Sequence, residues 1–330
     1  MLAFLIACDA RLAVTGADTG RPPENIIGDS AETADTATES EDTGELVWDC
    51  AALPSRGDFD DNELEGPRGY HDVIFDNAGN ILGSDGSTLM SATYEGVATP
   101  VVPGVGTLQG MARLPDGDIV AADDLGARLL RITAEGATST LAGDLPGIYG
   151  VTVGPDGMIY TGPILRGARA EMVRVDPATG LAQQWVRLPA IDSPRMVVFS
   201  VDNTVGYIAT TGRALVYAVD LDADLNPIGE ARVYAEGVGN GWQDGIGLDV
   251  CGNLYIPDYA SSGLYRVAPD GTSENLFRPR AGIYGHGLEW GSGIGGWRQD
   301  AIYMPQPYDQ NTVREVVVGA PSADRLRSDR

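Results

Sequence analysis

One pattern of residues repeats along the chain, and this repeat constrains the fold more than any other feature. Its clearest copy is QDGIGLDVCGNLYIPDYASSGLYRVAPDG at 243–271, in which short apolar strands are separated by a tight Gly turn, a loop and an Asp-Gly turn. Copies recur about every 40 residues, as in propeller blades of four short strands. No segment keeps a helical period of 3.6 residues. The sequence predicts an all-β, six-bladed β-propeller over residues 46–320, followed by a tail at 321–330.

The turn after the first strand of each copy sets the register of the blades. Eight residues before the turn Gly or Asn, five copies carry a polar or aromatic residue, and the sixth copy aligns through its apolar pair Leu288 and Trp290. We call the six residues at this position the ring: His71, Gln109, Tyr149, Arg195, Asp244 and His286. Because the innermost strands of a propeller line its central channel, we expect the ring to surround one mouth of that channel.

The last blade has only three strands before the repeats end. Its outer strand must come from before residue 69, and the apolar run Leu46-Val47-Trp48 is the best candidate. Closure by an N-terminal strand joins the first and last blades and removes an open sheet edge.

The N-terminal segment reads as an export leader with a tether. MLAFLIAC, at 1–8, resembles a bacterial lipobox, in which Cys8 would carry the lipid; the alternatives are an ordinary secretory leader or an apolar start with no function. Residues 9–45 hold ten acidic residues and two Arg with no strand or helix period, which predicts a disordered acidic linker. We therefore expect an exported lipoprotein of the cell envelope, placed in the periplasm or at the cell surface.

The formal net charge of -25 limits the class of partner. A strongly acidic chain without a basic block argues against nucleic acids and anionic membrane surfaces as binding partners. We expect a monomer that binds a small molecule and meets the membrane only through the lipid anchor.

Two cysteines remain when Cys8 is assigned to the lipid. Cys50 and Cys251 both lie near predicted turns or strand ends, and export implies an oxidising compartment. We predict a Cys50–Cys251 disulfide; two free thiols are the alternative.

From about residue 69 to 315 the repeats resemble the gluconolactonase/regucalcin-like (senescence marker protein, SMP-30/LRE-like) superfamily of six-bladed propellers, most closely in DGIGLDVCGNLYIPDY. The resemblance implies one divalent cation, typically Ca²⁺, held by ring residues, with an Asp of the fifth blade as ligand and base; Asp244 matches it. The family's Asn of blade four falls on Arg195, and its Glu of blade one falls on His71 or Tyr70. The resemblance therefore implies the fold more firmly than the lactonase activity. Propellers of the strictosidine-synthase-like and NHL types share the same pattern.

The chain has only two histidines, and both fall in the ring. Since blades five, six and one are neighbours, Asp244, His286 and His71 are predicted to cluster. Two His and one carboxylate suit Zn²⁺ or Fe²⁺ better than Ca²⁺. The alternative is a polar, water-filled mouth in which these side chains only form hydrogen bonds, and an Arg195–Asp244 ion pair would exclude the metal.

Three functions remain open at this point. The first is binding of a small ligand or metal at the channel mouth without turnover. The second is metal-dependent hydrolysis of a lactone or ester, with Asp244 or a histidine activating water and Arg195 holding a substrate carboxylate. The third is a scaffold for protein interactions. Four Asp residues at the ends of second strands are expected to cap turns rather than act chemically: Asp85, Asp123, Asp124 and Asp258.

Overall fold

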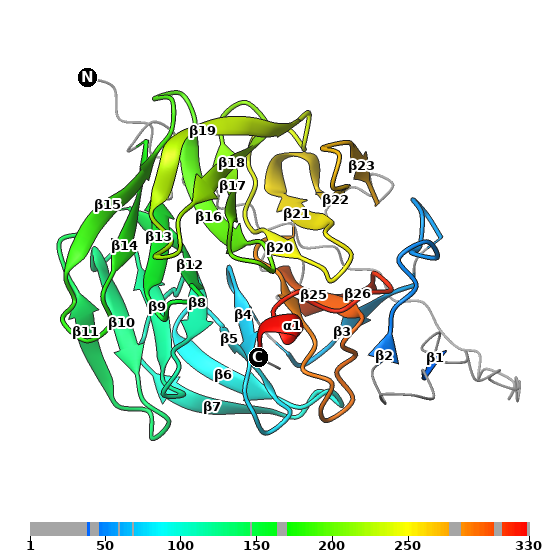
Figure 1. Cartoon of the computed structure of the whole chain (residues 1–330). Helices are drawn as coiled ribbons and strands as arrows, with labels where there is room; N and C mark the ends of the chain where they lie inside the picture. The colour runs from blue at the N-terminus through cyan, green and yellow to red at the C-terminus, as the bar shows by residue number, and fades with distance from the viewer. Residues whose placement is uncertain are drawn as a thin grey trace, which may run out of the picture. The chain divides into compact units, whose positions relative to one another are not determined.

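The computed structural model describes residues 38–39, 46–58, 60–67, 69–145, 147–163, 170–276, 285–306 and 312–328. The predicted leader at 1–8 and nearly all of the predicted linker at 9–45 lie outside these residues. Within them, six antiparallel four-stranded sheets follow one another around a central axis, as Figure 1 shows. The protein is therefore an all-β six-bladed propeller, as the repeat predicted.

Each blade runs from an inner strand at the axis to an outer strand at the rim. The inner strands are β4 (Val73–Phe75), β8 (Met111–Arg113), β12 (Ile148–Val153), β16 (Ser193–Phe199), β20 (Gly247–Leu248) and β24 (Glu289–Trp290). The second strands are β5 (Ile81–Ser84), β9 (Ile119–Asp123), β13 (Ile159–Pro163), β17 (Val205–Thr211), β21 (Leu254–Asp258) and β25 (Ala301–Gln306).

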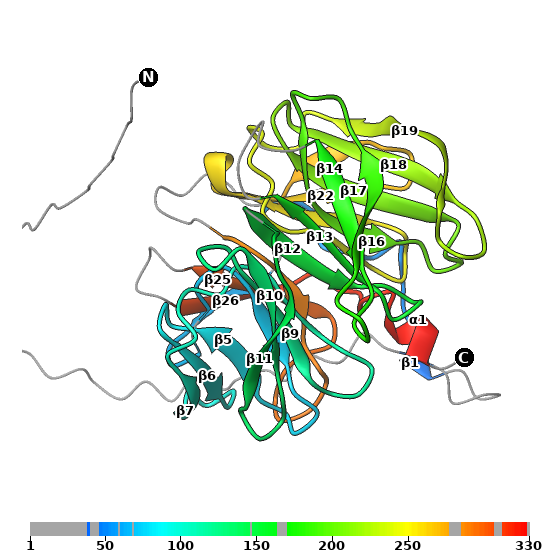
Figure 2. The same ribbon diagram turned by 90° about the vertical axis from the view of Figure 1, so that its left-hand side faces the viewer.

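The third strands are β6 (Thr88–Ala92), β10 (Arg128–Ile132), β14 (Glu171–Val175), β18 (Leu215–Leu221), β22 (Gly263–Val267) and β26 (Thr312–Val317). The outer strands are β7 (Ala98–Pro103), β11 (Thr138–Ala142), β15 (Ala182–Arg187), β19 (Pro227–Glu236), β23 (Ser273–Asn275) and, in blade six, β3 (Asp61–Leu64). Figure 2 shows the structure turned by 90°, with the four strands of one blade, β16 to β19, beside one another.

The strand that closes the ring of blades is β3, and the prediction of Leu46-Val47-Trp48 for this role was wrong. Leu64 pairs with Val313 of β26, while Leu46–Val47 forms β2 and pairs with β1 (Thr38–Glu39), a two-residue strand within the predicted linker. An outer strand has one face in solvent, and only Leu64 of β3 is buried. The segment DNEL therefore lacks the apolar signal by which the closing strand was sought.

The register predicted from the turns agrees with the structure. Gly79, Gly117, Gly157 and Gly252 all lie in the left-handed region, with φ between 75° and 94°. The equivalent residue of blade four is Asn203 with φ 61°, a conformation that Asn tolerates better than most side chains. The turn positions are thus equivalent in five blades.

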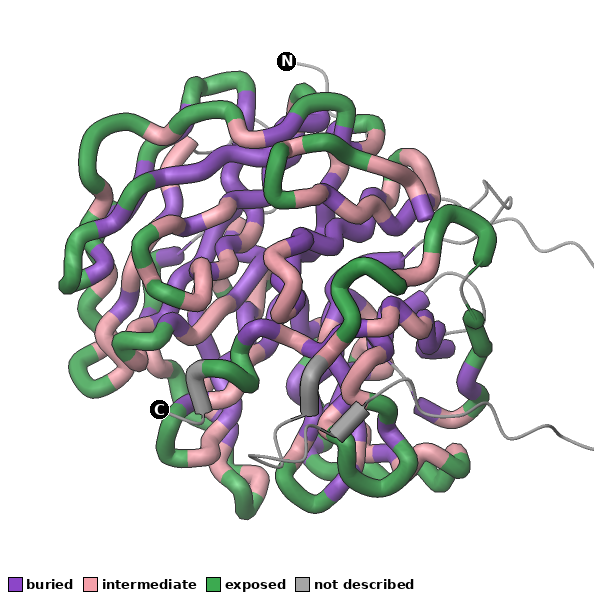
Figure 3. Tube along the Cα trace, turned by 45° about the vertical axis from the view of Figure 1, so that its right-hand side comes forward, coloured by how far each residue is buried: buried purple, intermediate pink, exposed green. Residues whose placement is uncertain are grey.

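The apolar core lies between neighbouring blades. Second strands such as β13 and β21 are buried along their whole length, because both faces of each sheet pack against another sheet. In Figure 3 the buried residues follow the strands and the exposed ones follow the turns. The sequences of these strands are therefore nearly continuous apolar runs, as expected when both faces of a strand are covered.

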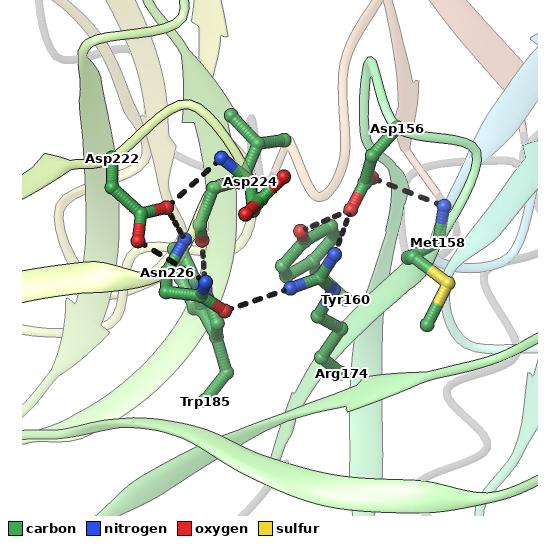
Figure 4. A network of polar contacts seen from close by, with 9 residues as sticks. Asp156, Met158, Tyr160, Arg174, Trp185, Asp222, Asp224 and Asn226 are labelled. Atoms are coloured by element: carbon green, nitrogen blue, oxygen red, sulfur yellow. Dashed lines mark hydrogen bonds and ion pairs between the residues drawn. The ribbon is translucent and has the colours of Figure 1, made fainter.

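Many of the acidic residues stabilise turns. In Figure 4, the Asp156 carboxylate accepts hydrogen bonds from Tyr160 Oη at 2.9 Å and Arg174 Nη2 at 2.6 Å. Arg174 Nη1 donates to Asn226 Oδ1 at 3.2 Å, and the backbone N and the Nδ2 of Asn226 donate to the Asp222 carboxylate. Of the four Asp residues expected to cap turns, Asp258 accepts three backbone N–H groups. These contacts give some of the acidic residues a structural role in turns.

The two ends of the described chain are attached to blade five. Cys50 and Cys251 form the predicted disulfide, with a Cα–Cα distance of 5.6 Å. The C-terminal segment returns to the same blade, where Val250 N donates to Pro321 O, before the short helix α1 (Arg325–Ser328). Among the described residues, no helix is both long and apolar enough to cross a membrane.

Candidate functional site

The six ring residues lie where the inner strands of the propeller begin. All six are buried: His71, Gln109, Tyr149, Arg195, Asp244 and His286. The glycine that follows several of them allows this convergence. Gly110 N donates to Tyr149 O at 2.8 Å, and a Cβ on Gly110 would overlap that carbonyl. Neighbouring inner strands therefore touch at the ring, and their first side chains are forced together.

Three aromatic side chains of the ring form one polar contact group. His71 Nδ1 lies 3.0 Å from His286 Nδ1, and Tyr149 Oη lies 3.2 Å from each of these nitrogens. His286 Nδ1 is also 3.1 Å from Asp244 Oδ2. The predicted cluster of Asp244, His286 and His71 is thus present, and Tyr149 belongs to it.

Arg195 and Asp244 form a buried ion pair inside the ring. The guanidinium Nη2 contacts Asp244 Oδ1, and the two side chains are 1% and 0% exposed. The guanidinium also stacks on the Tyr149 side chain, 3.5 Å from the centroid of its aromatic ring. Arg195 is therefore fixed by an opposite charge and by an aromatic face.

The electrostatic environment determines which ring groups carry charge at neutral pH. Burial lowers the pKa of His71 to about 3, helped by His286 and Arg195 and opposed by Asp244. Burial alone would raise the pKa of Asp244, but Arg195 and His286 outweigh it, so this pKa is lowered. At neutral pH, His71 is neutral and Asp244 is ionised.

The ring residues do not fit the divalent cation that the family resemblance implies. No group of three or more His, Cys, Asp or Glu side chains in the described part of the chain could hold a metal ion. The chemical reason is visible in the ring: Asp244 already balances the charge of Arg195, and the two imidazole Nδ1 atoms face each other and Tyr149. The three side chains expected to bind a metal, His71, Asp244 and His286, are therefore engaged in an internal ion pair and a hydrogen-bonded group.

Two buried glutamines at this end of the propeller have polar atoms that the described residues do not satisfy. Gln109 Oε1 in the ring lacks a hydrogen-bond partner among them, and so do both amide atoms of Gln306. Gln306 follows Pro305, whose carbonyl accepts a hydrogen bond from His286 N at 3.2 Å. The sequence reasoning missed Gln306, because no repeat position marked it.

A separate cavity of about 380 Å³ occupies the channel beyond the ring. Asp72, Glu289 and Asp324 contribute carboxyl groups to a wall that also carries many apolar side chains. Burial raises the pKa of Asp72 to about 7, and burial with the charges of Asp324 and Asp72 raises that of Glu289 to about 8. Asp72 stands where four other blades have the glycine that follows the ring, and this departure was the sequence signal that could have revealed it.

The Asp72 carboxyl has a structural function within this wall. It accepts hydrogen bonds from Val73 N at 3.0 Å and from Met111 N at 2.9 Å. These bonds connect the inner strands of blades one and two on the side of the ring that faces the cavity.

Comparison with known proteins gives a family and a set of structural neighbours. Residues 106–278 match the family described as the SMP-30/Gluconolactonase/LRE-like region. No curated protein sequence matches the chain.

A gluconolactonase from Xanthomonas campestris is 18% identical, with a TM-score of 0.65 over 83% of this chain and 93% of that one. The calcium-binding protein regucalcin from Agrobacterium tumefaciens is 19% identical, with a TM-score of 0.64 over 80% of this chain and 95% of that one. An auxiliary nutrient binding protein from Bacteroides thetaiotaomicron is 11% identical, with a TM-score of 0.61 over 80% of this chain and 74% of that one. At these identities the likeness shows the fold alone.

Proposed function

We propose that this chain, which belongs to the SMP-30/gluconolactonase/LRE-like family, is an exported propeller. It binds a small polar molecule at the ring and does not convert it. The observation that carries this proposal is that no residue in the described part of the chain satisfies Oε1 of Gln109 or the two amide atoms of Gln306. A buried polar group without a partner is rare, and a water molecule or a ligand usually completes it. The two residues are 7% and 0% exposed, so a ligand that reaches them would be almost enclosed.

The acid–base properties of the ring favour binding over catalysis. A general base works best when its pKa lies near the operating pH. His71, with a pKa near 3, and Asp244, with a lowered pKa, are both weak bases at neutral pH. Arg195 is already paired with Asp244, which reduces its attraction for a substrate carboxylate.

The structural neighbours support two ligand classes. One neighbour is a nutrient binding protein and another is a gluconolactonase. Hydrolysis of a sugar lactone is therefore the second candidate function, and it would have to proceed without the cation site that the family resemblance implies.

Export through a lipid on Cys8 and a monomeric state also belong to this proposal. The Cys50–Cys251 disulfide supports export, because such bonds persist mainly in oxidising compartments. The ring residues are part of a site within one chain, so ligand binding would need no second copy.

The test is a thermal-shift screen of the full-length protein with sugar acids, aldonolactones, monosaccharides and amino acids. We expect at least one class to raise the Tm of the wild type. The increase should be smaller in Gln109→Ala and unchanged in Gln183→Ala, a matched substitution of an exposed glutamine on β15. A stabilising compound whose effect is the same in both variants would place its site elsewhere. Proton release from glucono-1,5-lactone, followed in the same preparations, would favour the hydrolase if it depends on the ring.

A further inference from the structure

The positive charge in the ring belongs to a side chain of the protein, the guanidinium of Arg195. Asp244 is the one ring residue that matches the ligand set implied by the family resemblance, and its carboxylate contacts the guanidinium of Arg195. The two residues belong to neighbouring blades four and five. A structural neighbour of this chain, regucalcin, is a calcium-binding protein, so the same fold elsewhere is associated with a bound cation.

A guanidinium in this position competes directly with a divalent cation. Arg is always protonated, so its charge cannot be removed to make room. Both side chains of the pair are almost fully buried, and repulsion between a metal ion and a fixed positive charge is strong in such a setting. Stacking on Tyr149, with 3.5 Å between the guanidinium carbon and the centroid of the aromatic ring, holds the charge in place.

We propose that the guanidinium of Arg195 replaces the divalent cation, so that the ring is complete without a metal. Asp244 then balances an internal charge, and the ring binds its ligand independently of any metal ion. The proposal does not depend on which small molecule the ring accepts.

The proposal predicts that one substitution would convert the ring into a cation site. Arg195→Asn removes the fixed charge and leaves the Asp244 carboxylate, an amide oxygen and the Nδ1 atoms of His71 and His286. The two Nδ1 atoms are already 3.0 Å apart, and Asp244 Oδ2 is 3.1 Å from one of them. Imidazole nitrogens and a carboxylate are ligands that Zn²⁺ prefers.

The experiment titrates Zn²⁺ into the full-length wild type and Arg195→Asn by calorimetry, with Ca²⁺ as a second probe. The matched control is Arg232→Asn, which removes an Arg from the same blade in an ion pair that is about half exposed. We expect Arg195→Asn to bind one Zn²⁺ and to gain about 5 °C in Tm at a concentration about 100-fold above Kd. The wild type and Arg232→Asn should show no such site. Because the chain has no histidine outside the ring, a second nitrogen-rich site cannot obscure the result.

Several outcomes would overturn the proposal. One is that the wild type binds Zn²⁺ or Ca²⁺ stoichiometrically and that the double variant His71→Ala, His286→Ala does not. Another is a folded Arg195→Asn protein that gains no cation binding. If Arg195→Asn is unfolded as purified, circular dichroism with added Zn²⁺ decides: recovery of the folded spectrum supports the proposal, and no recovery contradicts it. If the double variant Arg195→Asn, Asp244→Asn loses the Zn²⁺ binding that Arg195→Asn gained, the location of the site is confirmed.

Discussion

Replacing Asp244 by Asn should destabilise the propeller far more than the same replacement in an exposed ion pair. The substitution keeps the size of the side chain and removes its charge, which leaves the Arg195 guanidinium buried without a counter-charge. The paired side chains are 1% and 0% exposed. Breaking a buried pair by removing one partner costs about 3–5 kcal/mol.

Asp220→Asn is the matched control for this prediction. Asp220 pairs with Arg232 in blade four, and the two side chains are 57% and 53% exposed. An exposed pair contributes less than about 1 kcal/mol, because water screens both charges. The two substitutions are chemically identical, so the difference between them measures the effect of burial.

The assay is urea and thermal unfolding of the wild type and both variants. At about 2 °C per kcal/mol for a domain of this size, Asp244→Asn should lower Tm by about 6–10 °C, and Asp220→Asn by about 2 °C or less. Adding Arg195→Met to Asp244→Asn should recover much of the loss, since the unpaired charge is then removed. Equal losses in the two single variants, or no recovery in the double variant, would refute the buried pair.

The pH dependence of the same pair has a defined sign. The pKa of Asp244 is lowered in the folded state, so its stabilising effect is present above the unfolded pKa of about 3.9. The effect is lost as the pH falls through the lower folded pKa. The difference in stability between the wild type and Asp244→Asn should therefore be constant from pH 5 to pH 7 and shrink in stronger acid.

Four further predictions can be tested on the same preparations. Reduction of Cys50–Cys251, or Ser at both positions, should cost up to about 5 kcal/mol, because the bond closes a separation of 201 residues; unchanged Tm under reductant would contradict this. The pKa of Glu289 is raised to about 8, so the folded state keeps a proton that the unfolded chain loses, and stability should fall as the pH rises toward 8. Glu289→Gln should reduce that fall and leave the part that comes from Asp72, whose pKa is also raised by burial, whereas Glu135→Gln, at an exposed position, should retain the whole fall; equal pH profiles would exclude Glu289 as a cause. A chelator should leave the Tm of the wild type unchanged, and a decrease would indicate a resident metal. Cys8→Ser should move the exported protein from the detergent phase to the aqueous phase, and unchanged partitioning would argue against the lipid anchor.

Local spacing in the sequence was enough to predict the propeller and the residues of its ring. A strand–turn–strand unit is short, and its turn requires Gly or Asn with positive φ, so residues such as Gly79 and Asn203 mark equivalent positions along the chain. Because the distance from turn to mouth is the same in five blades, the count led to His71, and the apolar pair Leu288 and Trp290 of the sixth blade led to His286, in both cases without knowledge of their contacts. The pairing of Cys50 with Cys251 followed from the few cysteines that the chain has.

The contacts among those residues were decided only by the tertiary structure. Whether Asp244 binds a metal or Arg195 depends on how closely the inner strands of neighbouring blades approach, and no spacing along one strand contains that distance. The same limit applies to the closing strand. Strand β3 buries only Leu64, and its place depends on pairing with β26, which begins about 250 residues later in the chain. A sequence records the periodicity of each blade, while contacts between segments far apart in the sequence depend on the geometry of the closed ring.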